Sequence, residues 1–97
     1  MHHIVATFSI GADVPAPKVV GVRTGYAPHH KFANIVYLAS GFHQYDDKEI
    51  HYPGESIKAR ITFPSWQYFR DGLSVGDIFE VRELERVIGY GTIDEIL

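Results

Sequence analysis

Two segments of this chain place apolar residues at every second position, and this pattern constrains the fold more than any other feature. They cover residues 4–10 and residues 56–63. A period of two puts alternate side chains on opposite faces, as in a strand with one buried face. The second segment is the clearer of the two. Its expected inward residues are Ile57, Ala59, Ile61 and Phe63.

The rest of the chain is also predicted to be mainly strands and turns. Residues 11–17 contain glycine and two prolines and should form an exposed loop. Residues 52–55 should form a tight turn, because proline fixes φ and glycine tolerates positive φ. A short helix of a turn or two is expected at residues 64–72, with Ser65 as its N-cap and Gly72 as its end. Further strands are predicted at residues 32–38, 78–83 and 88–97, and residues 42–45 either continue the first of these or start another.

Strands at short intervals with turns between them favour an all-β antiparallel barrel or sandwich. The chain has 97 residues, enough for one domain covering residues 1–97. It is 45% hydrophobic, with no apolar run long enough to cross a membrane and no start typical of a secretory signal. It contains no cysteine, so we expect a cytoplasmic protein without disulfides or thiolate sites.

Sequence motifs for catalysis or cofactor binding are missing. The chain has neither a phosphate-binding glycine loop nor a Gly-x-Ser-x-Gly nucleophile motif. The carboxylates of Asp46 and Asp47 lie in a polar stretch typical of a solvated loop. Six histidines are present, but the adjacent pairs at residues 2–3 and 29–30 lack metal-ligand spacing. We therefore expect surface histidines, no metal and no cofactor.

RNA binding is an alternative that the residue types leave open. Cationic and aromatic side chains could together form a surface that binds phosphates and stacks bases. The net charge of −3 argues against it, because phosphate-binding proteins usually carry a basic surplus. The alternative role of the tyrosines is to pack the barrel. The residues concerned are Lys31, Lys58, Arg60, Arg82, Arg86, Tyr26, Tyr37 and Tyr90.

Five short motifs follow one another along the chain. They are Gly25-Tyr26-Ala27-Pro28, Tyr52-Pro53-Gly54-Glu55, Gly76-Asp77-Ile78-Phe79, Phe79-Glu80-Val81-Arg82-Glu83 and Val87-Ile88-Gly89-Tyr90-Gly91. In this order and spacing the chain resembles the C-terminal barrel (domain 3) of elongation factor Tu and related translational GTPases. The resemblance implies a small closed antiparallel β-barrel. It also implies a docking surface, which that family uses for tRNA, for the nucleotide-exchange factor and for the neighbouring GTPase domain.

The chain departs from that family where the family contacts RNA. The family's Gly-Gly-Arg loop, which lies close to the T stem of aminoacyl-tRNA, is replaced by Leu84, Glu85 and Arg86. Ala27 stands where the family has an arginine. These changes add bulk and negative charge and remove a cation, so they weaken the case for tRNA. Residues 65–71 resemble an insertion into the barrel, and the GTPase domain has no counterpart here.

The sequence thus predicts a non-catalytic binding module whose partner is another protein. That partner would be translation-related, with the chain acting alternatively as a mimic or decoy of elongation factor Tu, or as an immunity-type antidote. The alternative from another class is a domain that binds RNA or tRNA. Trp66 and Phe69 could instead cover an open end of the barrel. The candidate contact residues are Arg82, Glu83, Glu85, Arg86, Trp66, Tyr68 and Phe69.

Overall fold

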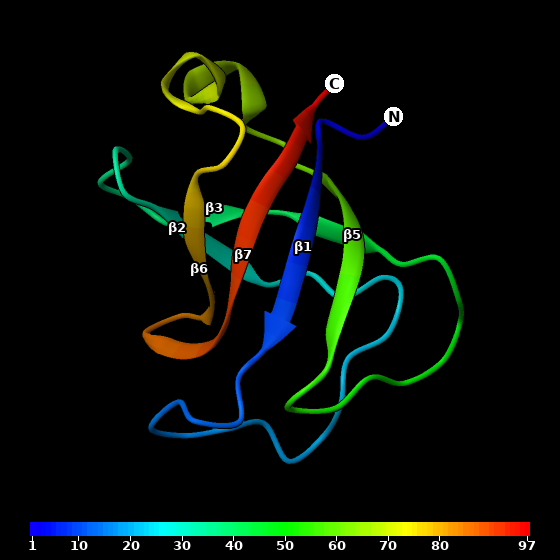
Figure 1. Cartoon of the computed structure of the whole chain (residues 1–97). Coiled ribbons are helices and arrows are strands. Elements are labelled where there is room, and N and C mark those ends of the chain that lie inside the picture. The colour runs from blue at the N-terminus through cyan, green and yellow to red at the C-terminus, as the bar shows by residue number, and fades with distance from the viewer.

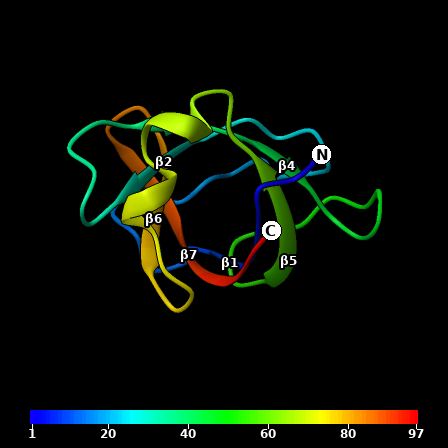
Figure 2. The same ribbon diagram turned by 90° about the horizontal axis from the view of Figure 1, so that it is seen from above.

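The computed structural model describes residues 1–97, and its strands form one antiparallel sheet that curls on itself (Figure 1, Figure 2). The order of the strands across the sheet is β3-β2-β6-β7-β1-β5-β4. The predicted all-β class is confirmed. The strands are β1 (Ile4–Ile10), β2 (His29–Phe32), β3 (Ala39–Ser40), β4 (Phe42–Gln44), β5 (Ser56–Thr62), β6 (Ile78–Glu83) and β7 (Arg86–Ile96).

The sheet closes into a barrel because its two outermost strands follow each other in the chain. β3 and β4 are separated only by Gly41, which bends the chain from β2 on one side to β5 on the other. A Cβ atom on Gly41 would lie 2.8 Å from Cε1 of His30 and 2.9 Å from a ring carbon of Phe63. Only glycine fits this bend without moving core side chains. We call residues 39–44 the seam.

Aromatic rings fill the barrel. Phe8, Phe32, Phe63 and Phe79 are essentially inaccessible to solvent, and the rings of Phe32 and Phe79 lie 5.0 Å apart between centroids. The alternation in β1 and β5 is confirmed, because its apolar residues point into this core and only Ile57 is partly exposed. The core residues are Ile4, Ala6, Phe8, Ile10, Val22, Phe32, Ala39, Tyr45, Ala59, Ile61, Phe63, Phe69, Leu73, Phe79, Val81, Ile88 and Ile93.

The strand predicted at residues 32–38 is wrong. β2 ends at Phe32, and the chain turns there, with the Ile35 amide donating to the Phe32 carbonyl at 3.1 Å. The ammonium group of Lys31 donates to the carbonyls of Phe32 and Ile35 and holds the turn. Asn34 disfavours a strand at this point, and Val36 is left fully solvent-exposed. The apolar run therefore does not identify a strand.

The predicted short helix is two 3-10 turns, η1 (Trp66–Tyr68) and η2 (Arg70–Gly72). Phe69 separates them with φ −135° and ψ −4°, and its ring packs into the core. Ser65 makes no capping hydrogen bond through its side chain. No helix in the structure has the length and apolar character needed to span a membrane.

The barrel has two distinct ends (Figure 1). The aromatic end carries η1, η2 and both chain termini, with the Leu97 amide donating to the His3 carbonyl at 2.9 Å. The hairpin end carries the β6–β7 turn and the loop that follows β1. β7 starts at Arg86, two residues before its predicted start, because Glu83 and Arg86 pair across a two-residue turn.

Gly91 gives a test of the packing inside the barrel. It lies opposite Phe79, and a Cβ atom there would come within 2.2 Å of that ring. We expect Gly91→Ala to lower the free energy of unfolding by about 1–3 kcal/mol, because the ring must move in a filled core. Urea denaturation measures the change.

The matched control is Gly72→Ala, where the nearest neighbour of the new methyl group is Ile35 at 3.5 Å, an ordinary contact. This variant should stay within about 0.5 kcal/mol of the parent. Equal effects of the two substitutions would contradict the described packing of Phe79.

Candidate functional site

The predicted contact residues lie in two groups at opposite ends of the barrel. Arg82, Glu83, Glu85 and Arg86 lie in the β6–β7 hairpin, whereas Trp66, Tyr68 and Phe69 lie in and beside η1 (Figure 1). The structure therefore does not combine them into one surface.

Glu83 joins three segments at the hairpin end. Its Oε2 atom accepts hydrogen bonds from Lys18 Nζ at 2.6 Å and from the Tyr26 hydroxyl at 2.5 Å. Partial burial raises the pKa of Glu83, but the two hydrogen bonds outweigh it and hold the pKa below its usual 4.5. Burial and the bond to Glu83 raise the pKa of Tyr26. The carboxylate thus ties the loop after β1 and the segment before β2 to the hairpin.

The two arginines of the hairpin are engaged within the protein. Arg86 donates from Nε to the Ala16 carbonyl at 2.7 Å and from Nη2 to the Pro17 carbonyl at 2.6 Å. Arg82 donates from Nε to Glu80 at 2.8 Å on the outer face of β6. Neither guanidinium is held out toward solvent as a free phosphate ligand.

The tip of the hairpin combines backbone strain with an exposed apolar side chain. Leu84 has φ +58° and is the only residue other than glycine with positive φ. Its side chain is 67% exposed, and its amide donates to Nδ1 of His29 at 3.2 Å. Beside it is an open depression of about 330 Å³. Its lining residues are Tyr26, Ala27, Pro28, His29, Glu83 and Leu84.

At the aromatic end, most of the predicted contact residues are covered. Phe69 is only 3% exposed, so its predicted role as a contact is wrong and it packs in the core. Trp66 is sandwiched between His3 and Phe63, with ring centroids 4.9 and 5.8 Å away. These rings cover the end of the barrel, the alternative that the sequence left open. Only Tyr68, at 76% exposed, is freely accessible.

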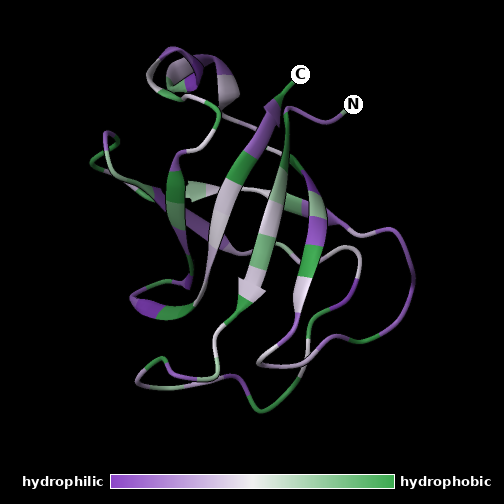
Figure 3. Ribbon diagram, viewed as in Figure 1, coloured by the Kyte–Doolittle hydropathy of each residue, from purple (hydrophilic) through white to green (hydrophobic).

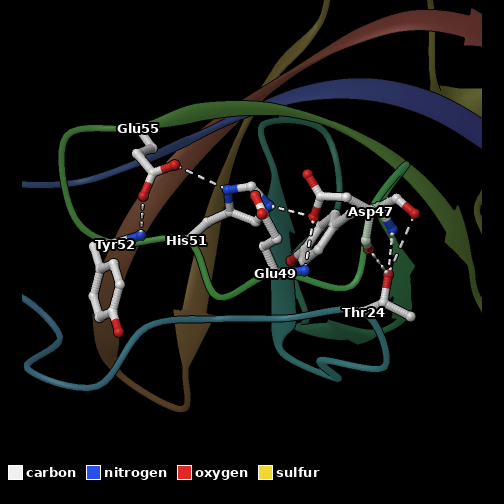
Figure 4. Close-up of polar contacts among 7 residues, drawn as sticks. Thr24, Asp47, Glu49, His51, Tyr52 and Glu55 are labelled. Carbon is white, nitrogen blue, oxygen red and sulfur yellow. Dashed lines mark hydrogen bonds and ion pairs between the residues drawn. The ribbon is translucent and has the colours of Figure 1, made fainter.

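An ionic cluster that the sequence analysis missed lies beside the turn before β5 (Figure 4). His51 lies between two carboxylates, with Nε2 2.8 Å from Asp47 and Nδ1 2.9 Å from Glu55. The hydrogen bonds to Glu55 and Asp47 raise the pKa of His51 above its usual 6.5. The bond to His51 lowers the pKa values of both carboxyl groups. When His51 is protonated, both of its nitrogens donate, and neither has a free lone pair to act as a base or ligand.

Besides His51, the side chains of His30 and His43 are buried. The prediction of surface histidines is therefore wrong for these three residues. His30 is completely buried and His43 is 2% exposed. Their Nε2 atoms lie 2.8 Å apart, and Nδ1 of His43 is 2.8 Å from the Tyr45 hydroxyl. The sequence signal that could have found His30 is its position two residues before Phe32, on the same inward face of β2.

The structure contains no group of three or more His, Asp or Glu side chains arranged to hold a metal ion. The depressions in the surface are shallow, and the largest, about 440 Å³, lies outside the barrel over β2, β6 and β7. Its lining includes Ile78, Tyr90, Lys31, Glu80 and Arg82.

The His51 cluster predicts a particular pH dependence of stability. Because the folded-state pKa of His51 is raised, its contribution is fully present below pH 6.5 and is lost as the pH rises through the folded-state value. The lowered carboxyl pKa values make the contribution fade again below about pH 4. We expect His51→Gln to destabilise the protein more at pH 6 than at pH 9, as measured by urea denaturation. A loss that is equal at both values would contradict the ionic role.

No protein-family model matches this sequence, and no curated protein matches it either.

Proposed function

We propose that this protein is a non-catalytic binding module that docks onto another protein in the cytoplasm through its hairpin end. The motifs resemble the C-terminal barrel of translational GTPases, so the proposed partner is a protein of the translation apparatus that recognises such a barrel. The chain then acts as a stand-alone copy of that docking surface.

The observation that carries the proposal is the conformation of Leu84. A non-glycine residue in the left-handed region costs roughly 1–2 kcal/mol, and this one also exposes most of its apolar side chain. The two-residue turn between β6 and β7 requires positive φ at this position, but glycine would supply it at a lower cost and without an exposed apolar side chain. Backbone strain of this kind is concentrated at functional sites, where the side chain it presents makes a contact.

Other apolar side chains are exposed at the same end. The loop after β1 carries Val19 and Val20, which are both mostly exposed, and the turn before β5 carries Tyr52, which is half-exposed. The turn is bonded to the end of β1 by the Gly54 amide, which donates to the Ile10 carbonyl at 2.8 Å. Figure 3 shows hydrophobic residues in this loop and in the β6–β7 turn. Exposed apolar side chains also occur elsewhere, as at Val36 and Tyr68, but here the loop that carries them is bonded to the Leu84 hairpin through Lys18 and Glu83. Neighbouring exposed apolar groups are typical of a protein-binding surface.

The charges favour a protein partner over RNA. The arginines of the hairpin are engaged by internal carbonyls and carboxylates, and so is Lys18. Glu85, next to Leu84 in the turn, has no ion-pair partner, so the tip carries a free negative charge. A free carboxylate repels phosphate and suits a protein surface with a basic rim.

The key experiment is the substitution Leu84→Gly, for which stability and binding should change in opposite directions. Glycine relieves the positive φ, so the free energy of unfolding should stay the same or rise by about 1 kcal/mol. At the same time, recovery of the bound partner from a lysate of the host should fall at least tenfold. Urea denaturation and quantitative pull-down measure the two effects.

Two controls make the result specific. Tyr68→Ala removes a side chain that is at least as exposed, at the opposite end, and should keep the partner bound. Glu85→Gly, where φ is not positive, should lower stability by about 0.5–1 kcal/mol. The proposal is wrong if Leu84→Gly retains full binding. It is also wrong if glycines at both positions create tight, salt-sensitive tRNA binding, the outcome expected of an RNA-binding domain.

A further inference from the structure

The buried histidines form a hydrogen-bonded chain in which the position of every proton is determined. Nδ1 of His30 lies 2.9 Å from the Ala39 carbonyl, which can only accept, so this nitrogen carries the proton. Nε2 of the neutral His30 ring is then an acceptor, and Nε2–H of His43 donates to it. Nδ1 of His43 in turn accepts from the Tyr45 hydroxyl. With both rings neutral, each ring nitrogen and the Tyr45 hydroxyl have a hydrogen-bond partner.

The surroundings of the pair offer nothing to balance a positive charge. Phe8 packs edge-on against His43 at 5.3 Å, and Phe63 against His30 at 5.0 Å. The titratable groups that face the pair are Tyr26, Tyr45 and the neighbouring His29, with no carboxylate among them. Burial lowers the pKa of His30 to about 4 and that of His43 well below 6.5.

One added proton places a positive charge in the core wherever it binds. On Nδ1 of His43 it donates to the hydroxyl oxygen of Tyr45, whose own proton then loses the acceptor it had. On Nε2 of His30 it forces the His43 proton to Nδ1, with the same result at Tyr45. Both cases leave a charge in the core with no carboxylate beside it, so protonation favours a state in which the pair reaches water.

The pair connects two strands that no backbone ladder joins. His30 lies in β2 and His43 in β4, on either side of the Gly41 bend. The ladders at the seam are short, because β3 pairs with β2 at two positions and β4 pairs with β5 at three. Three more backbone bonds, donated by the amides of Gly25, Gly41 and His43, tie the seam to the segment before β2. The ladders of β1 with β5 and β7 are much longer.

We propose that the His30–His43 pair is an acid-sensitive closure of the barrel. When the surroundings acidify, the seam opens and the two rings are protonated, while β1, β5 and β7 stay paired. This inference does not depend on the proposed docking function.

The direction and size of the effect follow from proton linkage. Histidines that are neutral when closed and have a pKa near 6.5 when open favour opening as the pH falls below 6.5. Between pH 7.5 and 5.5 each histidine should raise the opening constant roughly tenfold, so the pair should raise it roughly 100-fold.

Amide hydrogen exchange read by NMR tests this at residue resolution. The probes are the amides of Gly25, Gly41 and His43, which bond across the seam. Corrected for intrinsic exchange rates, their opening constants should rise roughly 100-fold from pH 7.5 to 5.5. At pH 5.5 they should also exceed the global unfolding constant measured by urea denaturation. Equal constants for the seam amides and the β1 amides at pH 5.5 would show global unfolding only and overturn the proposal.

Two variants test whether these two histidines, and not other titratable groups, cause the rise in the opening constants. His43→Gln keeps a donor for Nε2 of His30 but removes one titratable ring, so the rise should shrink to roughly tenfold. The double variant His30→Phe, His43→Leu should show no rise. If the double variant does not fold, the result for His43→Gln alone tests the proposal. A rise of 100-fold in His43→Gln would show that other groups drive the opening.

Discussion

Closure of the sheet is the constraint on which the rest of this structure depends. An open sheet of this length would expose two edges with unpaired backbone groups. Here the chain itself joins the edges, because β3 and β4 are successive and only Gly41 lies between them. The same bend brings β2 and β4 close enough for their histidines to bond inside the core. The closed barrel, its core and the buried hydrogen-bonded chain therefore all depend on the bend at Gly41.

The strands that bury one face were predictable from the sequence, whereas the segments around the seam were not. β1 and β5 show clear alternation because every inward position is apolar. In β4 the pattern misleads, since His43 points inward and Phe42 is half-exposed. An imidazole is stable there only because another ring satisfies it, and that partner is 13 residues away in the chain. Local patterns contain no information about such a partner.

The candidate site was predictable in position and less so in role. The motifs around residues 82–86 predicted contact residues in this segment, which forms the β6–β7 hairpin at one end of the barrel. The charges predicted to contact a partner are largely internal ties instead. Glu83 bonds to Lys18, 65 residues earlier, and Arg86 holds the carbonyls of Ala16 and Pro17. Phe69 was also predicted to contact a partner, but its ring packs in the core. Leu84 acquires its importance only from a backbone angle that the sequence does not reveal.

The hydrogen bond between Leu97 and His3 has a topological consequence. It holds the first and last strands together at the end of the barrel that carries η1 and η2, away from the β6–β7 turn (Figure 1). A short linker could therefore join the termini, and a new start could be cut into an exposed loop, giving a circular permutant of the same barrel. For the same reason, a domain fused to either terminus would leave the Leu84 turn unobstructed.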